Sequence, residues 1–433
     1  MSRRIALALF VVAAVLAPAV PAHAVTVAPA LVIGGNFPDP DLLTVDGRWY
    51  AYATNTGGAN VPVAVASSLR GAWTRSGDAL PRLGAWARTG LTWAPDVSRR
   101  ADGRYLMYYT ARSTAIERQC IGAALADSPT GPFTPVGGAA LVCNAAEAGD
   151  IDPASYVDTD GRRYLLYKSD GNAIGVPTVL YLQEVAADGV TFVGGRTELL
   201  RSGRADEAGV IEAPVLRRDG GRYVLFYSQG GYGGDGYAVG YATSGALRGP
   251  YTKAARPLIS TASVNNTVRG PGGQDVVDGA VVFHGWVNNN TARSVYVADL
   301  GWDNGLPVVR GSRARYEAEA GVLVNCRVRS GAAGASNGQV AAYIDTAASY
   351  VEVSVHAPRA GTYTAYVGYA AGAGAAQHTL TVNGGAARVV DYPARGWDVW
   401  SQVAVDVTLN AGRNTLRLTH RTAFAEIDYV EIA

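Results

Sequence analysis

The stretch "VDGRWYAYAT", residues 45–54, joins an Asp-Gly turn to an aromatic, β-rich segment, and the chain repeats this pattern four more times. An Asp-Gly pair between apolar segments is a strong signal for a tight β-hairpin. The other copies are "ADGRYLMYYT" (101–110), "TDGRRYLLYK" (159–168), "RDGGRYVLFY" (218–227) and "VDGAVVFHGW" (277–286). Their turn aspartates stand 56 to 59 residues apart. Four short strands fit in such a unit, so the spacing predicts an all-β, five-bladed β-propeller over about residues 30–312.

Just before its turn, each repeat carries an acid or amide beside a proline or glycine. The segments are "NFPDPD" with Asp39, "WAPDV" with Asp96, "DIDPAS" with Asp152, "VIEAPV" with Glu212 and "PGGQD" with Gln274. The first strand of a blade is innermost, so we expect these side chains to ring one mouth of the central channel. The alternative is that they cap turns or brace blades, and of the five Asp96 fits that structural role best.

Convergent carboxylates suit glycoside cleavage, because one must be protonated and another ionised. A third carboxylate can orient the acid and raise its pKa. Trp93, Tyr50 and Tyr109 offer faces for sugar stacking or, equally, fill blade cores. His284 stands alone, and we interpret it as a core or supporting residue.

At these motifs the chain resembles glycoside hydrolase family 43, in the right order and over the whole propeller. The resemblance implies an inverting enzyme in which Asp39 is the general base, Glu212 the general acid, and Asp152 the residue that orients the acid and modulates its pKa. Trp93, Asp96 and Gln274 are then expected to contact substrate. Many members carry a histidine near a central metal or water cluster where this chain has Gly273 and Gln274, so we expect no cofactor for catalysis.

After the basic link "VVRGSRAR" (308–315) the composition changes to alternating strands with Gly and Asn turns, which predicts a β-sandwich. We therefore divide the mature chain into residues 25–312 and 313–433. The second part resembles carbohydrate-binding modules of families 6 and 35 at "YEAE" (316–319), "GWDVW" (396–400) and "IDYVEI" (427–432). That resemblance implies a jelly roll in which Trp397 stacks on a sugar. Its calcium-binding carboxylates would be Glu317, Glu319 and Asp428. A stabilising sandwich without a ligand is the alternative.

The charge and the N-terminus limit the partners and the compartment. The sequence has 37 basic and 36 acidic residues, which argues against nucleic acid or an anionic membrane as a partner. Residues 1–24 read as a signal peptide for secretion. In an oxidising compartment we expect a disulfide between Cys120 and Cys143, which bracket a hairpin, with Cys326 free; three buried thiols are the alternative.

We conclude from the sequence that the protein is a secreted, inverting exo-glycoside hydrolase of plant cell-wall pentose polysaccharides. An α-L-arabinofuranosidase acting on arabinose-containing polymers is our first choice. A β-xylosidase or bifunctional enzyme acting on xylose-containing polymers follows, and then an endo-arabinanase or exo-galactanase. From another class, a non-catalytic sugar-binding propeller should have lost a carboxylate, and none is lost. A related retaining group that acts on fructosyl sugars has "RDP" where this chain has "IDP", and phosphorylases need a basic phosphate site.

Overall fold

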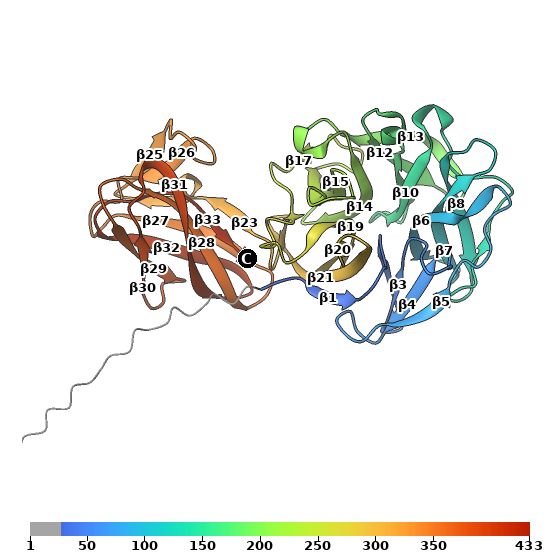
Figure 1. Cartoon of the computed structure of the whole chain (residues 1–433), viewed down its shortest axis with the longest axis horizontal. Helices are drawn as coiled ribbons and strands as arrows, with labels where there is room; N and C mark the ends of the chain where they lie inside the picture. The colour runs from blue at the N-terminus through green and yellow to red at the C-terminus, as the bar shows by residue number, and fades with distance from the viewer. Residues whose placement is uncertain (1–26) are drawn as a thin grey trace, which may run out of the picture.

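The computed structural model describes residues 27–433, and the expected signal peptide lies outside them. Figure 1 shows two β-rich bodies joined end to end, with the larger formed by the N-terminal part of the chain. The predicted all-β architecture, a five-bladed propeller followed by a β-sandwich, is confirmed. Within the described part of the chain, the helices are four single 3₁₀ turns: η1 (Ala145–Glu147), η2 (Gly171–Ile174), η3 (Ala205–Glu207) and η4 (Ala318–Ala320). No helix there is long and apolar enough to cross a membrane.

The first three blades are four-stranded antiparallel sheets in chain order, with the innermost strand first. Blade 1 has β2 (Asp41–Val45), β3 (Arg48–Tyr52), β4 (Pro62–Ala66) and β5 (Thr74–Asp78). Blade 2 has β6 (Ala87–Arg99), β7 (Tyr105–Ser113), β8 (Gln119–Ala126) and β9 (Thr134–Pro135). Blade 3 has β10 (Asp150–Val157), β11 (Arg163–Ser169), β12 (Val179–Val185) and β13 (Phe192–Arg201).

The last two blades each carry a fifth strand. Blade 4 has β14 (Ile211–Asp219), β15 (Arg222–Gln229), β16 (Ala238–Ser244), β17 (Thr252–Lys253) and β18 (Ile259–Ser260). Blade 5 has β19 (Arg269–Val277), β20 (Ala280–Val287), β21 (Ala292–Asp303), β22 (Leu306–Val309) and β1 (Ala30–Ile33). Strand β1 comes from the start of the described chain and pairs with β21, so the two ends of the propeller are joined in one sheet.

Five apolar clusters fill the propeller, one between each pair of neighbouring blades. Tyr50 and Tyr109 belong to the cluster between blades 1 and 2, so both are core residues, and the sugar-stacking alternative does not hold for them. In blade 2 the predicted disulfide between Cys120 and Cys143 is confirmed, with the two Cα atoms 4.8 Å apart. Cys326 is the free cysteine.

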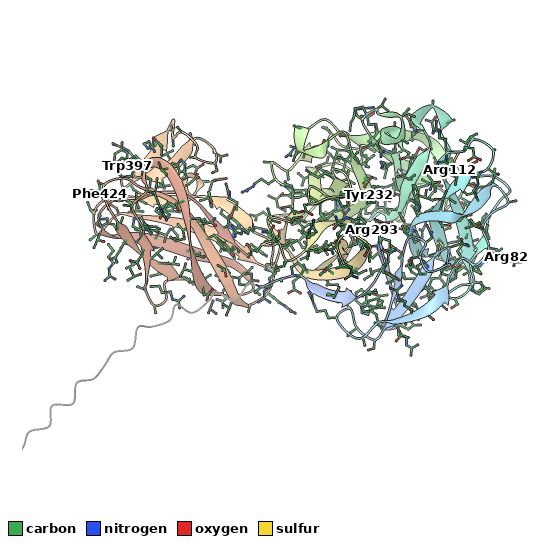
Figure 2. The ribbon with its side chains drawn as sticks, viewed as in Figure 1. Arg82, Arg112, Tyr232, Arg293, Trp397 and Phe424 are labelled. Carbon is green, nitrogen blue, oxygen red and sulfur yellow. A yellow bond between two sulfur atoms is a disulfide. The ribbon has the colours of Figure 1, made fainter. Side chains whose placement is uncertain are left out.

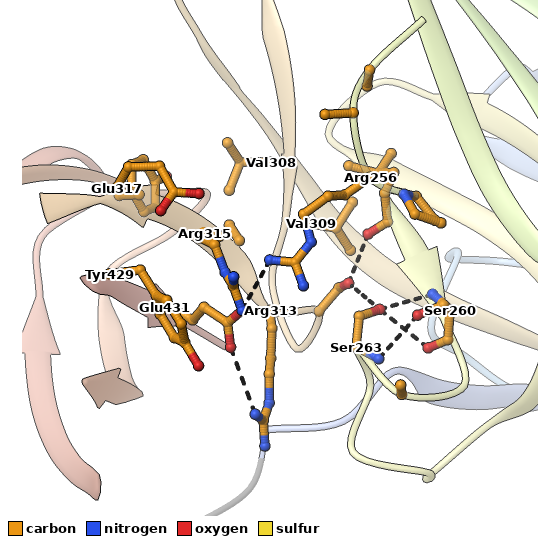
Figure 3. A pocket seen from close by; sticks show the side chains of 18 of the residues that line it. Arg256, Ser260, Ser263, Val308, Val309, Arg313, Arg315, Glu317, Tyr429 and Glu431 are labelled. Carbon is orange, nitrogen blue, oxygen red and sulfur yellow. Dashed lines mark hydrogen bonds and ion pairs between the residues drawn. The ribbon is translucent and has the colours of Figure 1, made fainter. Parts of the chain in front are cut away.

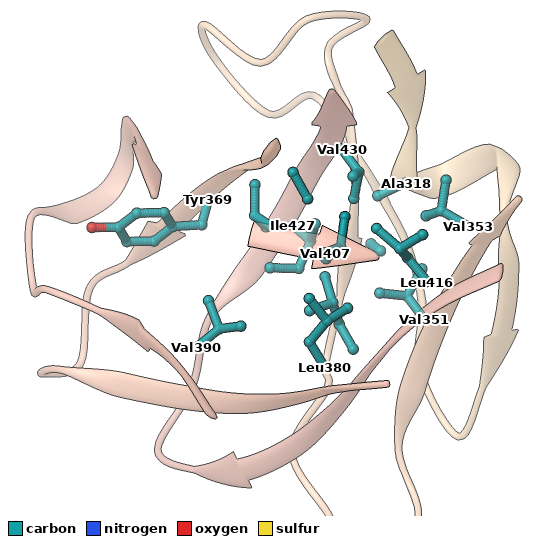
Figure 4. Packing of buried hydrophobic residues seen from close by; sticks show 14 of the residues in the cluster. Ala318, Val351, Val353, Tyr369, Leu380, Val390, Val407, Leu416, Ile427 and Val430 are labelled. Atoms are coloured by element: carbon teal, nitrogen blue, oxygen red, sulfur yellow. The ribbon is translucent and has the colours of Figure 1, made fainter. Parts of the chain in front are cut away.

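The sandwich packs two antiparallel sheets over one apolar core (Figure 4). One sheet contains β23 (Ala314–Glu317), β25 (Arg327–Ser330), β26 (Gln339–Ala342), β28 (Gly361–Ala371), β31 (Gly396–Leu409) and β33 (Glu426–Ile432). The other contains β24 (Val322–Val324), β27 (Tyr350–Ala357), β29 (Ala376–Val382), β30 (Arg388–Tyr392) and β32 (Gly412–Thr422).

Charged side chains join the two domains around a cavity of about 710 Å³ (Figure 3). The carboxylate of Glu431 is buried in the sandwich and is paired with Arg256 of the propeller (3.2 Å), with Arg313 of the link (3.6 Å) and with Arg315 (2.7 Å). The positive and negative residues that line this cavity balance, and of the predicted catalytic carboxylates Asp39 and Asp152 line a different cavity, in the channel of the propeller.

Candidate active site

Each blade bends its innermost strand at one equivalent residue. The five residues have a positive φ: Asp39 (54°), Ala94 (40°), Asp152 (53°), Ala213 (49°) and Gly273 (54°). In blades 2 to 5 the strand register shifts at this point, which is the mark of a β-bulge. A non-glycine residue in this conformation costs about 1–3 kcal/mol. The fold thus accepts strain at one mouth of the channel, where the bends turn side chains towards the axis.

Each bend is fixed by a hydrogen bond between its backbone N–H and a side chain of the preceding blade. In four of the five, the backbone N–H donates to a side chain at the end of that blade's second strand. The bonds are Asp39 to Nδ1 of His284 (3.1 Å), Ala94 to Oγ1 of Thr54 (2.9 Å), Asp152 to Oγ1 of Thr110 (3.2 Å) and Gly273 to Oγ of Ser228 (2.8 Å). In the remaining bend, the N–H of Ala213 donates to Oδ2 of Asp152 instead (3.0 Å). Blade 3 has Lys168 at the equivalent position, and an ammonium group cannot accept a hydrogen bond.

Asp96 is not one of the bend residues, so the expected alignment of Asp96 with Asp39 was wrong by two positions. Ala94 occupies the bend of blade 2, and Asp96 lies deeper in the channel. Its Oδ2 accepts the N–H of Ser155 in the next blade (2.9 Å), as Asp41 accepts that of Val97 (2.8 Å). Burial raises the pKa of Asp96 to about 6. These contacts favour the bracing role over the substrate-binding role, which stays a prediction.

Asp39 sits at the mouth as a fixed anion. Its Oδ2 accepts the hydroxyl of Thr54 (2.6 Å), and its Oδ1 lies 3.2 Å from a guanidinium nitrogen of Arg293. Burial alone would raise the pKa of Asp39, but the charge of Arg293 and the hydrogen bond from Thr54 outweigh it and hold the pKa well below its usual value. Asp39 is therefore ionised over the whole working range and can accept a proton from water.

His284 supports Asp39 without carrying a charge of its own. Its Nδ1 accepts the backbone N–H of Asp39, so the ring proton is on Nε2. Burial lowers the pKa of His284, and its ring stacks on Tyr237 with 5.9 Å between centroids. The interpretation of His284 as a buried supporting residue agrees with this geometry.

Glu212 is held at both carboxylate oxygens. Oε1 accepts the hydroxyl of Tyr237 (2.7 Å), and Oε2 lies 2.9 Å from Nζ of Lys168. Lys168 is fully buried, and a second carboxylate, Asp170, lies 3.7 Å from its Nζ. Burial acts to lower the pKa of Lys168, but the charges of Glu212, Asp152 and Asp170 raise it overall, so this lysine is a cation.

Asp152 takes up a proton more readily than an ordinary aspartate does. Burial, followed by repulsion from Glu212, raises the pKa of Asp152 to about 7, while Lys168 opposes the shift. The sequence suggested a negative Asp152 that keeps Glu212 protonated. The raised pKa instead keeps Asp152 itself partly protonated near neutral pH, and its effect on Glu212 stays a prediction.

The remaining predicted contacts lie beside these acids. Trp93 is half-buried and comes directly before the bend residue Ala94. Gln274 is buried, accepts the hydroxyl of Ser228 (2.7 Å) and donates to the carbonyl of Ala213 (2.6 Å). The deeper channel encloses about 240 Å³ and is lined by Asp39, Asp152 and Gln274 among others. Contact of Trp93 and Gln274 with substrate remains a prediction.

Sequence reasoning missed three side chains of the site: Lys168, Tyr237 and Arg293. A signal existed for Lys168. It ends the segment "TDGRRYLLYK", where the first two repeats have Thr54 and Thr110. Aligning the repeats would have shown a cation in place of a hydroxyl. Tyr237 and Arg293 lie outside the repeated motifs, in the stretch after a second strand, where the repeats diverge.

In the sandwich, Trp397 has an exposed fraction of 46% and lies at the end remote from the propeller (Figure 2). A Cβ added to Gly372 would come within 2.4 Å of the indole ring, so only glycine fits beneath it. Nearby, Arg329 pairs with Glu426 (2.6 Å) and Asp398 (2.8 Å). An exposed indole ring that packs against Gly372 on one side suits sugar stacking, and that role stays a prediction.

The three acids predicted to bind calcium meet around one loop. Ser336 donates to Glu317 and to Asp428, and Asn337 donates to Glu319 (3.2 Å). No group of three or more acidic, His or Cys side chains in residues 27–433 is arranged to hold a metal ion. The residue types nevertheless fit calcium, because Oε2 of Glu319 is buried without a hydrogen-bond partner in the structure, and calcium takes oxygen ligands. Calcium bound there would neutralise the repulsion that Glu319 and Asp428 exert on Glu317.

Comparison with known proteins gives a family for each domain. A family model described as glycosyl hydrolases family 43 matches residues 29–307, and one described as carbohydrate binding module (family 35) matches residues 314–433. A curated Aspergillus flavus protein, "Probable arabinan endo-1,5-alpha-L-arabinosidase C", is 27% identical over 60% of this chain and 84% of its own length. A Bacillus subtilis protein, extracellular endo-alpha-(1->5)-L-arabinanase 1, is 26% identical over 62% of this chain and 86% of its own.

Solved structures extend the likeness to the fold. A thermostable family-43 glycoside hydrolase is 26% identical, with a TM-score of 0.59 over 65% of this chain and 96% of its own. An exo-beta-1,3-galactanase from Phanerochaete chrysosporium is 20% identical, with a TM-score of 0.50 over 94% of this chain and all of its own. The second likeness concerns the fold alone, and it spans both domains.

Proposed function

The chain belongs to glycoside hydrolase family 43, and from that premise we propose that it is a secreted, inverting hydrolase of α-L-arabinofuranosyl linkages in arabinose-rich plant polysaccharides. The observation that carries this proposal is the division of charge across the channel mouth. Asp39 on blade 1 is held ionised by Arg293, whereas burial and the neighbouring Glu212 of blade 4 raise the pKa of Asp152 on blade 3 to about 7. Inverting hydrolysis needs one base and one acid on opposite faces of the sugar.

Asp39 takes a proton from a water molecule, and the oxygen of that water attacks the anomeric carbon. The bond from this carbon to the leaving oxygen breaks, and Glu212, acting as the general acid, gives that oxygen its proton. Lys168 and Tyr237 fix the orientation of the Glu212 carboxyl through their contacts with its two oxygens. The two carboxyl groups of Asp39 and Glu212 are expected to stand about 6.5–9.5 Å apart, which leaves room for the water.

The choice of arabinose rests on the relatives, two of which are named arabinan endo-hydrolases. Their names favour arabinan as the substrate and cleavage within the polymer, whereas exo cleavage was expected from the sequence. The size of products released early from linear arabinan separates these modes. Secretion is proposed from residues 1–24 and from the extracellular relative of Bacillus subtilis.

Variants of the two proposed catalytic acids test the mechanism. Glu212→Gln should impair substrates with poor leaving groups far more than nitrophenyl glycosides, because only the former need the proton. Asp39→Asn should impair both kinds of substrate alike, and added azide should restore part of the rate because it can attack in place of water. The assay compares nitrophenyl α-L-arabinofuranoside with arabinan, and nitrophenyl β-D-xyloside tests the main alternative. Activity on the xyloside alone would overturn the sugar assignment but not the mechanism.

A further inference from the structure

An aromatic pair stands beside Asp39 at the rim of the site. Tyr232, in the loop between β15 and β16, has an exposed fraction of 56%. Its ring stacks on that of Trp286 in β20, with 6.4 Å between centroids and 26° between planes. The indole N–H of Trp286 donates to the carbonyl of Tyr232 (2.6 Å). The two rings therefore form one surface from two different blades.

Arg293 connects this surface to the base. Its guanidinium carbon lies 5.3 Å from the ring centroid of Tyr232 and 5.5 Å from that of Trp286, within range of a cation–π contact. The same guanidinium lies 3.2 Å from Oδ1 of Asp39. Figure 2 shows Tyr232 and Arg293 next to one another on the propeller. The aromatic surface thus reaches the reaction centre through a single intervening side chain.

The loop that carries Tyr232, "GGYGGDG" at 230–236, is anchored despite its five glycines. Asp235 pairs with Arg269 (2.8 Å), and its carbonyl accepts the hydroxyl of Thr261 (2.9 Å). Gly270 packs so closely that an added Cβ would lie 2.6 Å from the carbonyl oxygen of Gly234. The loop ends at Tyr237, which holds Glu212. One anchored segment therefore contacts the acid at one end and presents an exposed ring near the base.

We propose that Tyr232 and Trp286 form a sugar-binding platform, a subsite that takes the sugar unit next to the one whose bond is cleaved. An exposed, preformed aromatic face can stack on the apolar face of a sugar ring at little entropic cost, because few rotors have to be fixed. The surface is partly apolar and the charge of the adjacent Arg293 is paired with Asp39, so it suits an uncharged furanose or pyranose ring. This inference rests on the proposed function, since it requires that the channel mouth cleave glycosidic bonds.

The test compares probes with and without a neighbouring sugar. The methyl glycoside of a single sugar cannot reach the platform, whereas an oligosaccharide of two to five units can. Tyr232→Ala in the full chain should lower kcat/KM for the oligosaccharides roughly tenfold more than for the methyl glycoside, on the scale of one lost aromatic contact. Tyr232→Phe, which keeps the ring, should restore the ratio. Phe192→Ala serves as the matched control, since it removes a similarly exposed ring from the outer strand β13.

The outcomes separate the platform from its alternatives. Equal losses on both kinds of probe, with a shifted acid limb of the pH profile, would mean that Tyr232 acts only by steadying Arg293, and would overturn the platform. No loss on either probe would overturn it as well. The panel includes arabino-, xylo- and β-1,3-galacto-oligosaccharides, so activity on a series other than arabinose contradicts the proposed function alone. The loss of kcat/KM on the oligosaccharides that the protein cleaves, relative to the loss on the corresponding methyl glycoside, then tests whether the platform exists.

Discussion

Nζ of Lys168 lies 2.9 Å from Oε2 of Glu212, and the lysine is fully buried. Its positive charge favours the ionised form of Asp152 and therefore opposes the rise in the pKa of that carboxyl. Burial and the repulsion between the two acids act in the opposite direction. The working pH of the site therefore depends on the balance between these opposing effects on the pKa of Asp152. In the described structure, Lys168 is the one positively charged side chain in contact with Glu212.

Replacing Lys168 by Met should shift that balance. Without the cation, the pKa of Asp152 should rise further, so the basic limb of kcat/KM against pH should move to higher pH. The variant should also lose stability, by about 3–5 kcal/mol at neutral pH, because the acidic side chains of Glu212 and Asp170 lose the buried cation that they contact. Lys168→Arg keeps the charge and is the control. A basic limb that stays in place in Lys168→Met would show that the lysine does not tune the acids.

The pH dependence of stability should report the pKa of Asp152. Its folded-state pKa of about 7 lies above the unfolded value of 3.8, so the folded protein binds more protons than the unfolded chain between these two pH values. Stability should therefore fall as pH rises through this window, by about 1.4 kcal/mol for each pKa unit of the shift. Asp152→Asn removes the titration and should flatten this part of the curve. Urea denaturation at pH 4.5 and pH 8 measures the effect. If the free energy of unfolding changed by the same amount between these pH values in the unchanged protein and in Asp152→Asn, the prediction would be contradicted.

The propeller should work without the sandwich if the chain ends after Arg313. The backbone N–H of Arg313 and the hydroxyl of Ser312 both donate hydrogen bonds to the propeller. A chain that ended before these two residues would lose both hydrogen bonds. The shortened protein should cleave small glycosides as the full chain does and lose affinity for insoluble polymer. In the full chain, Trp397→Ala should reproduce the loss of polymer affinity. Loss of small-substrate turnover on truncation would show that the sandwich completes the active site.

Calcium should stabilise the sandwich through Glu317, Glu319 and Asp428. At a calcium concentration one hundred times the dissociation constant, the gain would be roughly 2.7 kcal/mol. Ser336 must then release the carboxylates that it now bonds. Thermal unfolding with calcium and with a chelator measures the difference, and Glu319→Gln should abolish it. An unfolding temperature that the chelator does not change would contradict the proposed calcium site.

The architecture could be predicted because its signals are local. An Asp-Gly turn and the aromatic strand after it form a hairpin wherever they occur, and five regular copies leave few folds other than a propeller. The pairing of β1 with β21 could not be seen this way, since it joins residues such as Leu31 and Tyr296 from opposite ends of the domain and has no turn to mark it.

The candidate site was only partly predictable, for a similar reason. Asp39 and Asp152 each directly precede a proline and Glu212 lies two residues before one, and the structure brings all three to one mouth. The position of Asp96 was misjudged because a β-bulge inserts a residue without a sequence signature as strong as a turn. Ala94 has the bend that an aspartate was expected to occupy. Arg293 could not be found, because its contact with Asp39 depends on closure of the ring of blades.

The stereochemistry of the first product tests the central claim most directly. If Asp39 activates water while Glu212 protonates the leaving oxygen, hydrolysis is a single displacement at the anomeric carbon. Proton NMR of the full-length protein acting on an α-L-arabinofuranosyl substrate, recorded before the free sugar equilibrates, should show the β anomer first. An α anomer as the first product would require a covalent intermediate and two displacements, and would contradict the assignment of Asp39 as the base.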